Sequence, residues 1–247
     1  MRVALAQISP KLSKDNISLH EEEIRGVKDD ADVIIFPELS LNGYLLMDRV
    51  YEDSFKLDEL EVFKTLSNDI DIVLGCALRV KHKIFNSAVY FSKGEILHIH
   101  HKNNLPNYGM FEEARFFFKG TELNSFETPV GKSMVVVCED MWNSHTIDTI
   151  VQNRPEMVYV ISNSPARGFE DDGLEIEKKW KSVLKTTALL SGANVIFVNR
   201  VGFWGGSMIV GADGLLKNKM ELFKPKTEIF EINKNLSSMQ KYMLRNS

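Results

Sequence analysis

The sequence has little cysteine, a small net charge and no long apolar run. Its 247 residues include two cysteines, Cys76 and Cys138, too few for the disulfide framework of a secreted domain. The formal net charge of −4 gives no electrostatic reason to expect nucleic acid or a membrane surface as partner. No apolar run approaches the ~20 residues of a membrane-spanning helix, and the opening run at 1–7 is too short for a secretion signal. We therefore expect a reduced, cytoplasmic protein.

Apolar residues are spread along the whole chain. They make up 44% of the sequence, which excludes a disordered protein and suits one large α/β domain at this length. The sequence contains no internal repeat, no low-complexity segment and no linker that would separate two domains. We expect a single domain over residues 1–247.

The hydrophobic pattern predicts strands that alternate with helices and, later, hairpins. We expect strands at 2–8, 32–36, 71–78, 134–138, 158–161, 195–198 and 228–232. We expect helices at 15–27, capped by Asp15 and Asn16, at 57–66, and at 175–191, ended by Gly192. Turn residues at 92–95 and 212–214 predict two hairpins, 84–91 with 96–101 and 207–210 with 215 onwards. A polar tail is expected after 232. This order predicts an α/β sandwich with mixed sheets.

The first candidate for chemistry is Glu38. An apolar strand followed by Pro37 is expected to end at this carboxylate. A lone glutamate at a strand end is ordinarily solvated. A strand this apolar should be buried, however, and desolvation would raise the pKa of the Glu38 carboxyl and make it a better base.

The second candidate is Lys102. A hairpin strand ends there and enters a loop rich in Asn, Pro and Gly, followed by the acidic and aromatic cluster at 111–117. A lone lysine is nearly always on the surface. This loop is able to fold back over Lys102, and an ammonium held in that place would stabilise a developing oxyanion.

The third candidate is Cys138, at the end of a buried strand. Free cysteines are most often inert core residues, and Cys76 fits that interpretation. Cys138 fits it less well, because Glu139 and Asp140 follow at once and are not expected to enter an apolar core. A neighbouring ammonium would lower the pKa of the Cys138 thiol and supply the thiolate.

These three segments together resemble the nitrilase superfamily, the carbon–nitrogen hydrolases. That family has a Glu, a Lys and a Cys in this order, each at a strand end, and the resemblance runs from Arg2 to Phe230. A closer resemblance is to the glutaminase domain of glutamine-dependent NAD synthetases. It is carried by Asn107-Tyr108-Gly109, Phe111-Glu112-Glu113, Cys138-Glu139-Asp140-Met141-Trp142, Asn163-Ser164-Pro165 and Asn199-Arg200-Val201-Gly202.

The resemblance implies a fold and a set of roles. The fold is a four-layer α-β-β-α sandwich of two mixed sheets. Glu38 is implied as general base, Lys102 as oxyanion stabiliser and Cys138 as nucleophile, with Glu113 orienting the lysine and the substrate. The remaining candidates bind substrate: Tyr108 and Ser164 at the amide, Glu139 through its backbone N–H, and Trp142 in a motif loop that, like the loop of Trp204, would border the pocket.

The sequence departs from the synthetases in two respects. No Ser-Gly-Gly-x-Asp-Ser pyrophosphate loop is present, so we expect that ATP-driven amidation is not encoded in this chain. The segment 201–207 is also shorter than in relatives. If this loop borders the pocket, its shortening leaves glutamine specificity open.

The expected reaction is cleavage of a C–N bond in a small carboxamide, through a thioester, with release of ammonia. Glutaminase or ω-amidase activity is implied, and no metal or cofactor is expected. His98, His100 and His101 lack acidic ligands at local spacing and are interpreted as a packed or solvated strand face. The expected partners are a small amide and further copies of the chain, in a homodimer or larger assembly.

Three other functions remain open. One is hydrolysis of an N-carbamoyl amine. The second is a catalytically silent regulatory protein that keeps the fold. The third is a subunit that donates ammonia to a separate synthetase. The sequence also leaves open whether water or another amine accepts the acyl group.

Overall fold

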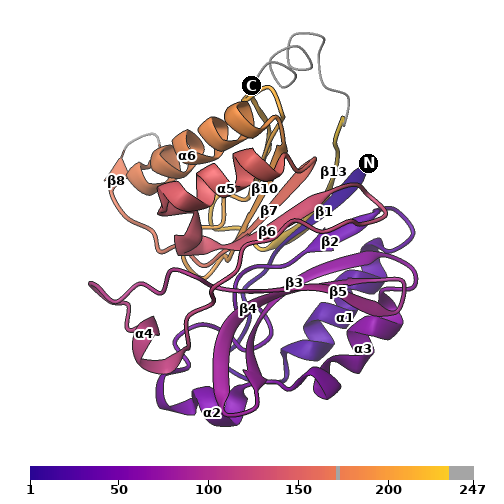
Figure 1. The fold of residues 1–247 in the computed structure, drawn as a ribbon, viewed down its shortest axis with the longest axis vertical. Coiled ribbons are helices and arrows are strands. Elements are labelled where there is room, and N and C mark those ends of the chain that lie inside the picture. The colour runs from indigo at the N-terminus through magenta and orange to yellow at the C-terminus, as the bar shows by residue number, and fades with distance from the viewer. Residues whose placement is uncertain (171–172, 234–247) are drawn as a thin grey trace.

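Two β-sheets pack face to face and are covered on their outer sides by helices, as Figure 1 shows. The computed structural model describes residues 1–170 and 173–233. Its layers follow in the order helices, sheet, sheet, helices, which confirms the predicted four-layer α-β-β-α sandwich. The predicted tail after residue 232 lies almost wholly outside the described residues.

The first sheet has the strand order β13-β1-β2-β3-β4-β5. Strands β1, β2 and β3 are parallel to each other and the other neighbours are antiparallel, so the sheet is mixed as expected. The bounds are β1 Arg2–Gln7, β2 Val33–Ile35, β3 Asp71–Val80, β4 Lys83–Ser92, β5 Glu95–His101 and β13 Lys226–Glu231. Helices α1 (Asn16–Val27) and α3 (Glu61–Leu66) cover its outer face.

The second sheet has the order β12-β11-β10-β7-β6 and is also mixed. Its strands are β6 Ser133–Val137, β7 Met157–Ser162, β10 Asn194–Asn199, β11 Met208–Val210 and β12 Leu216–Lys219. Helices α5 (Ser144–Asn153) and α6 (Glu175–Ser191) pack on its outer face. The remaining elements are short: α2 Val50–Asp53, α4 Glu113–Phe116, β8 Phe169–Glu170, β9 Gly173–Leu174, and 3₁₀ helices at Met47–Arg49, Leu57–Leu60 and Cys138–Trp142.

The alternation of side chains along each strand builds three apolar layers. On β1, Val3 and Leu5 lie between the sheets, whereas Ala4 and Ala6 face the helices. Because both faces of the inner strands are buried, these strands read as continuous apolar runs rather than as alternating ones. None of the helices in the described ranges is long and apolar enough to cross a bilayer.

Turn residues confirm the predicted hairpin between 84–91 and 96–101 and the predicted end of the helix at 175–191. Lys93 and Gly94 have φ of 50° and 80° and form a two-residue hairpin turn between β4 and β5, a geometry that needs positive φ at both positions. Gly192 ends α6 with φ of 69°, as expected of a helix stop.

Several boundaries differ from the prediction. Asp15 precedes α1 but makes no capping hydrogen bond with its side chain. The Asn16 amide instead binds the carbonyl of Ser13, at 2.7 Å, and that of Leu41. The predicted helix at 57–66 is a 3₁₀ turn followed by α3. Helix α5 was not predicted, although Asn143 caps it by accepting a hydrogen bond from the backbone of His145.

Candidate active site

Three strand ends bring the predicted catalytic residues to one place between the sheets. Glu38 follows β2 and Lys102 follows β5 in the first sheet, and Cys138 follows β6 in the second. The prediction that a strand runs to Glu38 was wrong, because β2 ends at Ile35. The backbone of Phe36 still bonds the carbonyl of Val73, but Pro37 has no N–H to continue the ladder.

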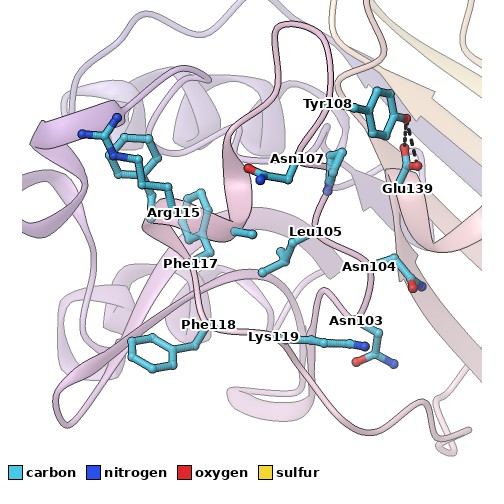
Figure 2. A pocket seen from close by; sticks show the side chains of 13 residues that line it. Asn103, Asn104, Leu105, Asn107, Tyr108, Arg115, Phe117, Phe118, Lys119 and Glu139 are labelled. Atoms are coloured by element: carbon cyan, nitrogen blue, oxygen red, sulfur yellow. Dashed lines mark hydrogen bonds between the residues drawn. The ribbon is translucent and has the colours of Figure 1, made fainter.

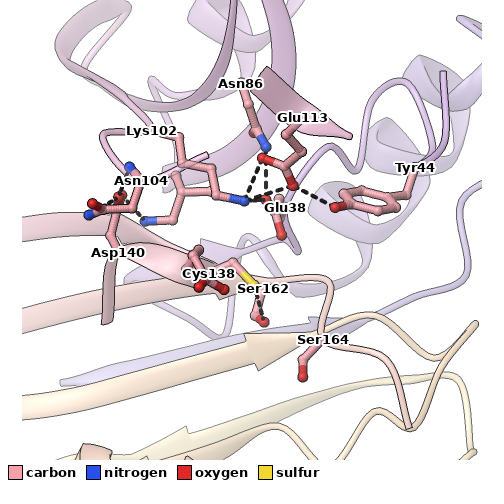
Figure 3. Close-up of polar contacts among 12 residues, drawn as sticks. Glu38, Tyr44, Asn86, Lys102, Asn104, Glu113, Cys138, Asp140, Ser162 and Ser164 are labelled. Atoms are coloured by element: carbon pink, nitrogen blue, oxygen red, sulfur yellow. Dashed lines mark hydrogen bonds and ion pairs between the residues drawn. The ribbon is translucent and has the colours of Figure 1, made fainter. Parts of the chain in front are cut away.

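A buried ionic cluster surrounds the ammonium of Lys102. Its Nζ lies 2.6 Å from Oε1 of Glu38 and 2.9 Å from Oε1 of Glu113. The Asn86 amide donates to Oε1 of Glu38 at 2.8 Å, and the Tyr44 hydroxyl donates to Glu113 at 2.5 Å. Figure 3 shows all five side chains converging. The structure thus joins Glu38, Lys102 and Glu113 as expected, and adds Tyr44 and Asn86, which the sequence did not single out.

The charges in this cluster compensate one another. Burial alone would lower the pKa of Lys102, but the carboxylates of Glu38 and Glu113 outweigh it and hold that pKa well above its usual value. Burial raises the pKa of Glu113, with a smaller contribution from Glu38 and opposition from Lys102. Oε2 of Glu38 has no hydrogen-bond partner within residues 1–170 and 173–233, so this oxygen is available to accept a proton.

Cys138 begins the 3₁₀ helix that follows β6, and its φ is 44°. A positive φ is uncommon for a residue with a side chain and turns the chain sharply at this position. The strand therefore ends at Val137, one residue earlier than predicted. Cys138 is partly exposed at this turn, whereas Cys76 is fully buried within β3, as its core interpretation predicted.

The thiol of Cys138 does not become acidic in these surroundings. Burial raises its pKa well above the usual value, and the charge of Glu38 adds to this effect. Lys102 lowers the pKa as predicted, but burial and the charge of Glu38 outweigh it. The hydroxyl of Ser162 donates to the sulfur at 3.3 Å. The resting thiol is therefore neutral, and its ionisation needs a base.

Asp140 is buried, but it lies in polar surroundings and not in an apolar core, as expected. Its carboxylate accepts hydrogen bonds from the backbone N–H groups of Asn103, Asn104 and Val137, and from Nε2 of His100 at 2.8 Å. A buried carboxylate is tolerated when donors satisfy it in this way. The loop after Lys102 supplies two of these donors and so provides the polar surroundings that were expected.

The neighbouring histidines are packed strand residues. The ring of His98 stacks on Phe126 with centroids 4.2 Å apart, and the ring of His101 stacks on Phe85 at 4.1 Å. Burial lowers the pKa of each of these two histidines to about 4. No group of three metal-binding side chains occurs among the residues that the structure describes.

A cavity of about 230 Å³ opens beside the sulfur of Cys138. All four predicted substrate residues line it: Tyr108, Glu139, Trp142 and Ser164. Trp142 meets the ring of Trp180 edge-on at 4.7 Å, and Nε1 of Trp180 donates to the hydroxyl of Ser164. These contacts give the cavity a rigid aromatic wall.

Charged groups of both signs lie around this cavity. The half-buried Glu139 carboxylate accepts the Tyr108 hydroxyl at 2.9 Å and 3.0 Å. Burial raises the pKa of Glu139, and this hydrogen bond opposes the rise. The sequence did not single out Arg167, whose guanidinium lies 5.6 Å from the centre of the Phe111 ring, or Lys179. Arg167 closely follows the Asn163-Ser164-Pro165 motif, and this position is the sequence signal that could have identified it as a pocket residue.

The loop at 201–207 touches the site differently from the prediction. Trp204 is fully buried and packs on Phe197, so it belongs to the core and not to the pocket wall. Phe203 instead meets the ring of Tyr44 edge-on at 6.4 Å. The short loop therefore reaches the ionic cluster through Tyr44.

A larger hollow of about 580 Å³ lies on the other side of the Tyr108–Glu139 pair (Figure 2). The residues that line it come from the loop after Lys102 and from the segment around α4, and Cys138 is not among them. The smaller cavity is therefore the one that reaches the sulfur.

Comparison with known proteins agrees with this geometry. Residues 2–241 match the carbon–nitrogen hydrolase family. The chain is 32% identical over 238 residues to the glutamine-dependent NAD(+) synthetase of Acinetobacter baylyi, which covers 90% of this chain and 42% of that protein. The structure of glutamine-dependent NAD+ synthetase from Acinetobacter baumannii is similar with a TM-score of 0.79 and 30% identity, over 92% of this chain and 44% of that one.

The fold is also found in a shorter protein. An amidase of the nitrilase superfamily from Nesterenkonia has a TM-score of 0.78 at 18% identity, over 100% of this chain and 94% of that one. In contrast, this chain spans less than half the length of the two synthetases. As its motifs predicted, the chain belongs to the carbon–nitrogen hydrolase family and is a hydrolase.

Proposed function

We propose that this protein cleaves the side-chain amide of glutamine, or of a similar α-amino acid amide, through a thioester on Cys138. The observation that carries the proposal is the buried cluster of Glu38, Lys102 and Glu113 beside a partly exposed thiol. A neutral thiol, a carboxylate with a free oxygen and a fixed ammonium are the groups that amide cleavage requires.

The first half of the reaction forms the thioester. Oε2 of Glu38 takes the proton of Cys138 while the sulfur attacks the amide carbon. The carbonyl oxygen becomes an oxyanion, held by Lys102 and by the backbone N–H of Glu139 in the first turn of the 3₁₀ helix. One such donor contributes roughly 3 kcal/mol in other hydrolases. Glu38 then protonates the leaving nitrogen, the C–N bond breaks and ammonia departs.

The second half releases the acid. Glu38 takes a proton from water, and the hydroxide oxygen attacks the thioester carbon. The same two donors hold the second oxyanion. Its collapse breaks the C–S bond, and Glu38 returns the proton to the sulfur of Cys138. Glu113 holds the ammonium of Lys102 in place at 2.9 Å and so orients it towards the substrate.

The cavity supports a small substrate with both charges. Its volume of about 230 Å³ suits an amino acid rather than a peptide. The Glu139 carboxylate would bind an ammonium, and the Arg167 guanidinium would bind a carboxylate. An N-carbamoyl amino acid lacks the ammonium, and a simple aliphatic amide lacks both groups. These substrates would leave a half-buried charge of the pocket unpaired.

A second role follows from the relatives. The two synthetases are named glutamine-dependent, and this chain matches less than half of each. We therefore propose as an alternative that the chain donates its ammonia to a separate synthetase. This role predicts low activity alone and a rise when the partner is added.

The test is ammonia release from the pure protein with glutamine, asparagine, N-carbamoyl compounds and simple amides. We expect glutamine to be preferred, Cys138→Ala to be inactive, and Cys76→Ala, a change in the core, to keep activity. Turnover by Cys138→Ala at the wild-type rate would refute the mechanism. A preference for N-carbamoyl compounds would refute the proposal that glutamine is the substrate. Wild-type protein inactive on every amide, alone and with a synthetase, would favour a silent regulatory protein.

We also propose a cellular compartment and an oligomeric state for this protein. The free thiols of Cys76 and Cys138 support a reducing compartment such as the cytoplasm. We expect a homodimer or larger assembly, which light scattering on the eluted protein would measure.

A further inference from the structure

The ends of β6 and β7 place a serine against the reactive sulfur. The two strands are parallel and Val137 pairs with Ile161, so Cys138 and Ser162 are the next residues on adjacent strand ends. Ser162 is fully buried, and its hydroxyl donates to Sγ of Cys138 at 3.3 Å. Figure 3 shows this contact on the side of the sulfur away from the Lys102 cluster.

This hydroxyl is independent of the ionic cluster. Glu38 and Lys102 both act on the thiol, in opposite directions, and they are bonded to each other at 2.6 Å. Within the described part of the chain, the side chain of Ser162 makes no hydrogen bond except the one to sulfur. Its backbone is fixed in β7 between β6 and β10, so the hydroxyl is held in place from both sides.

We propose that Ser162 is a further catalytic residue, whose hydroxyl stabilises the Cys138 thiolate when Glu38 removes the proton. The inference rests on the proposed function. A hydrogen bond to sulfur is weak while the thiol is neutral and becomes charge-assisted when the thiolate forms. The hydroxyl thus favours the anion without adding a charge that would pair with Glu38.

The test is the ionisation of Cys138 in Ser162→Ala. The rate of Cys138 alkylation by iodoacetamide, located by mass spectrometry, is followed against pH. Loss of one hydrogen bond to a charged group should raise the apparent pKa of Cys138 by roughly 1 unit or more. At neutral pH kcat should fall roughly tenfold with little change in KM. Ser133→Ala, a buried serine at the opposite end of β6, should shift neither quantity.

A matched pair separates hydrogen bonding from packing. Ser162→Thr keeps the hydroxyl and should keep the wild-type pKa, whereas Ser162→Val has the same shape without it and should behave like Ser162→Ala. Superimposable alkylation profiles for Ala, Val and wild type would overturn the proposal, as would equal shifts in Thr and Val. Failure of the proposed function would look different, because it would appear in the turnover of wild type and Cys138→Ala, whereas the alkylation profiles of the serine variants are measured without any substrate.

Discussion

Asp140 and His100 are 40 residues apart in sequence and meet at 2.8 Å in the interior, each almost completely buried. Asp140 also accepts hydrogen bonds from the backbone N–H groups of Val137, which precedes Cys138, and of Asn103, which follows Lys102. One carboxylate therefore fixes the distance between the strand end that carries the ammonium and the turn that carries the sulfur. Burial opposes ionisation of Asp140, but the His100 hydrogen bond and the other donors lower its pKa.

Asp140→Asn should loosen this connection. The amide offers one acceptor oxygen and turns an NH₂ group towards donors, so the free energy of unfolding should fall by ~2 kcal/mol or more and kcat should fall with it. Urea unfolding and ammonia release measure the two effects. Asp71→Asn is the matched control, since Asp71 is a buried carboxylate at the start of β3 that accepts the Tyr90 hydroxyl. Asp71→Asn should lower stability alone. Equal kcat losses in both variants would contradict a local role for Asp140.

Replacement of Lys102 should damage stability as well as catalysis. Lys102→Met leaves the buried carboxylates of Glu38 and Glu113 facing each other without a cation. Breaking a buried pair in this way typically destabilises by ~3–5 kcal/mol, and loss of an oxyanion donor lowers kcat by ~10²-fold or more. The double variant Lys102→Met with Glu113→Gln should recover part of the stability and none of the activity. Denaturant titration of wild type, the single variant and the double variant checks this. Unchanged stability of Lys102→Met would disprove the view that Lys102 compensates the charges of the two carboxylates.

Arg167 and Glu139 should control substrate choice rather than chemistry. Arg167→Gln and Glu139→Gln each remove one charge from the cavity wall, so KM for glutamine should rise by roughly tenfold or more while kcat changes little. Hydrolysis of butyramide, which has neither charge, should be unaffected. Lys185→Gln, an exposed change on α6, serves as control. An equal loss of activity on glutamine and butyramide would show that these residues do not recognise the charged groups of the amino acid.

Stability should fall as the solution is acidified below pH 6.5. Burial lowers the pKa of His20 from 6.5 to about 4, and its ring bonds Asn16 and Ser40. Between these values the unfolded chain takes up a proton that the folded chain does not, so stability is complete above pH 6.5 and is lost towards pH 4. At ~1.4 kcal/mol per pKa unit the loss from His20 is about 3 kcal/mol. His98 and His101 act in the same direction.

Unfolding midpoints in urea between pH 4 and pH 8 measure this dependence. His20→Gln should flatten the profile, and His82→Gln, in an exposed turn, should not. A wild-type profile that does not change across this range would contradict the assignment.

The sequence predicted the layers because the inner strands are largely apolar runs, and it predicted the catalytic candidates because each follows a predicted strand. Partners across the site were beyond this reasoning. Asn86 reaches Glu38 from the middle of β4, and Ser162 reaches Cys138 through strand register, which depends on how the sheets assemble. Polar surroundings were expected for Asp140, but its individual donors were not, because hydropathy takes no account of groups that a distant loop supplies.

The proposed base Glu38 and the ammonium of Lys102 follow strands of one sheet, and the proposed nucleophile Cys138 follows a strand of the other. The seam between these sheets consists largely of apolar side chains such as Leu5 and Val137, and among the described residues no backbone ladder crosses it. Apolar contact therefore sets the alignment of the two sheets together with a few side-chain hydrogen bonds, such as those that Asp140 accepts from His100 and Asn103. A sub-ångström shift of one sheet against the other would move the sulfur of Cys138 away from the carboxylate of Glu38 while the hydrogen bonds within each sheet stayed intact. This enzyme would therefore lose activity before it lost secondary structure.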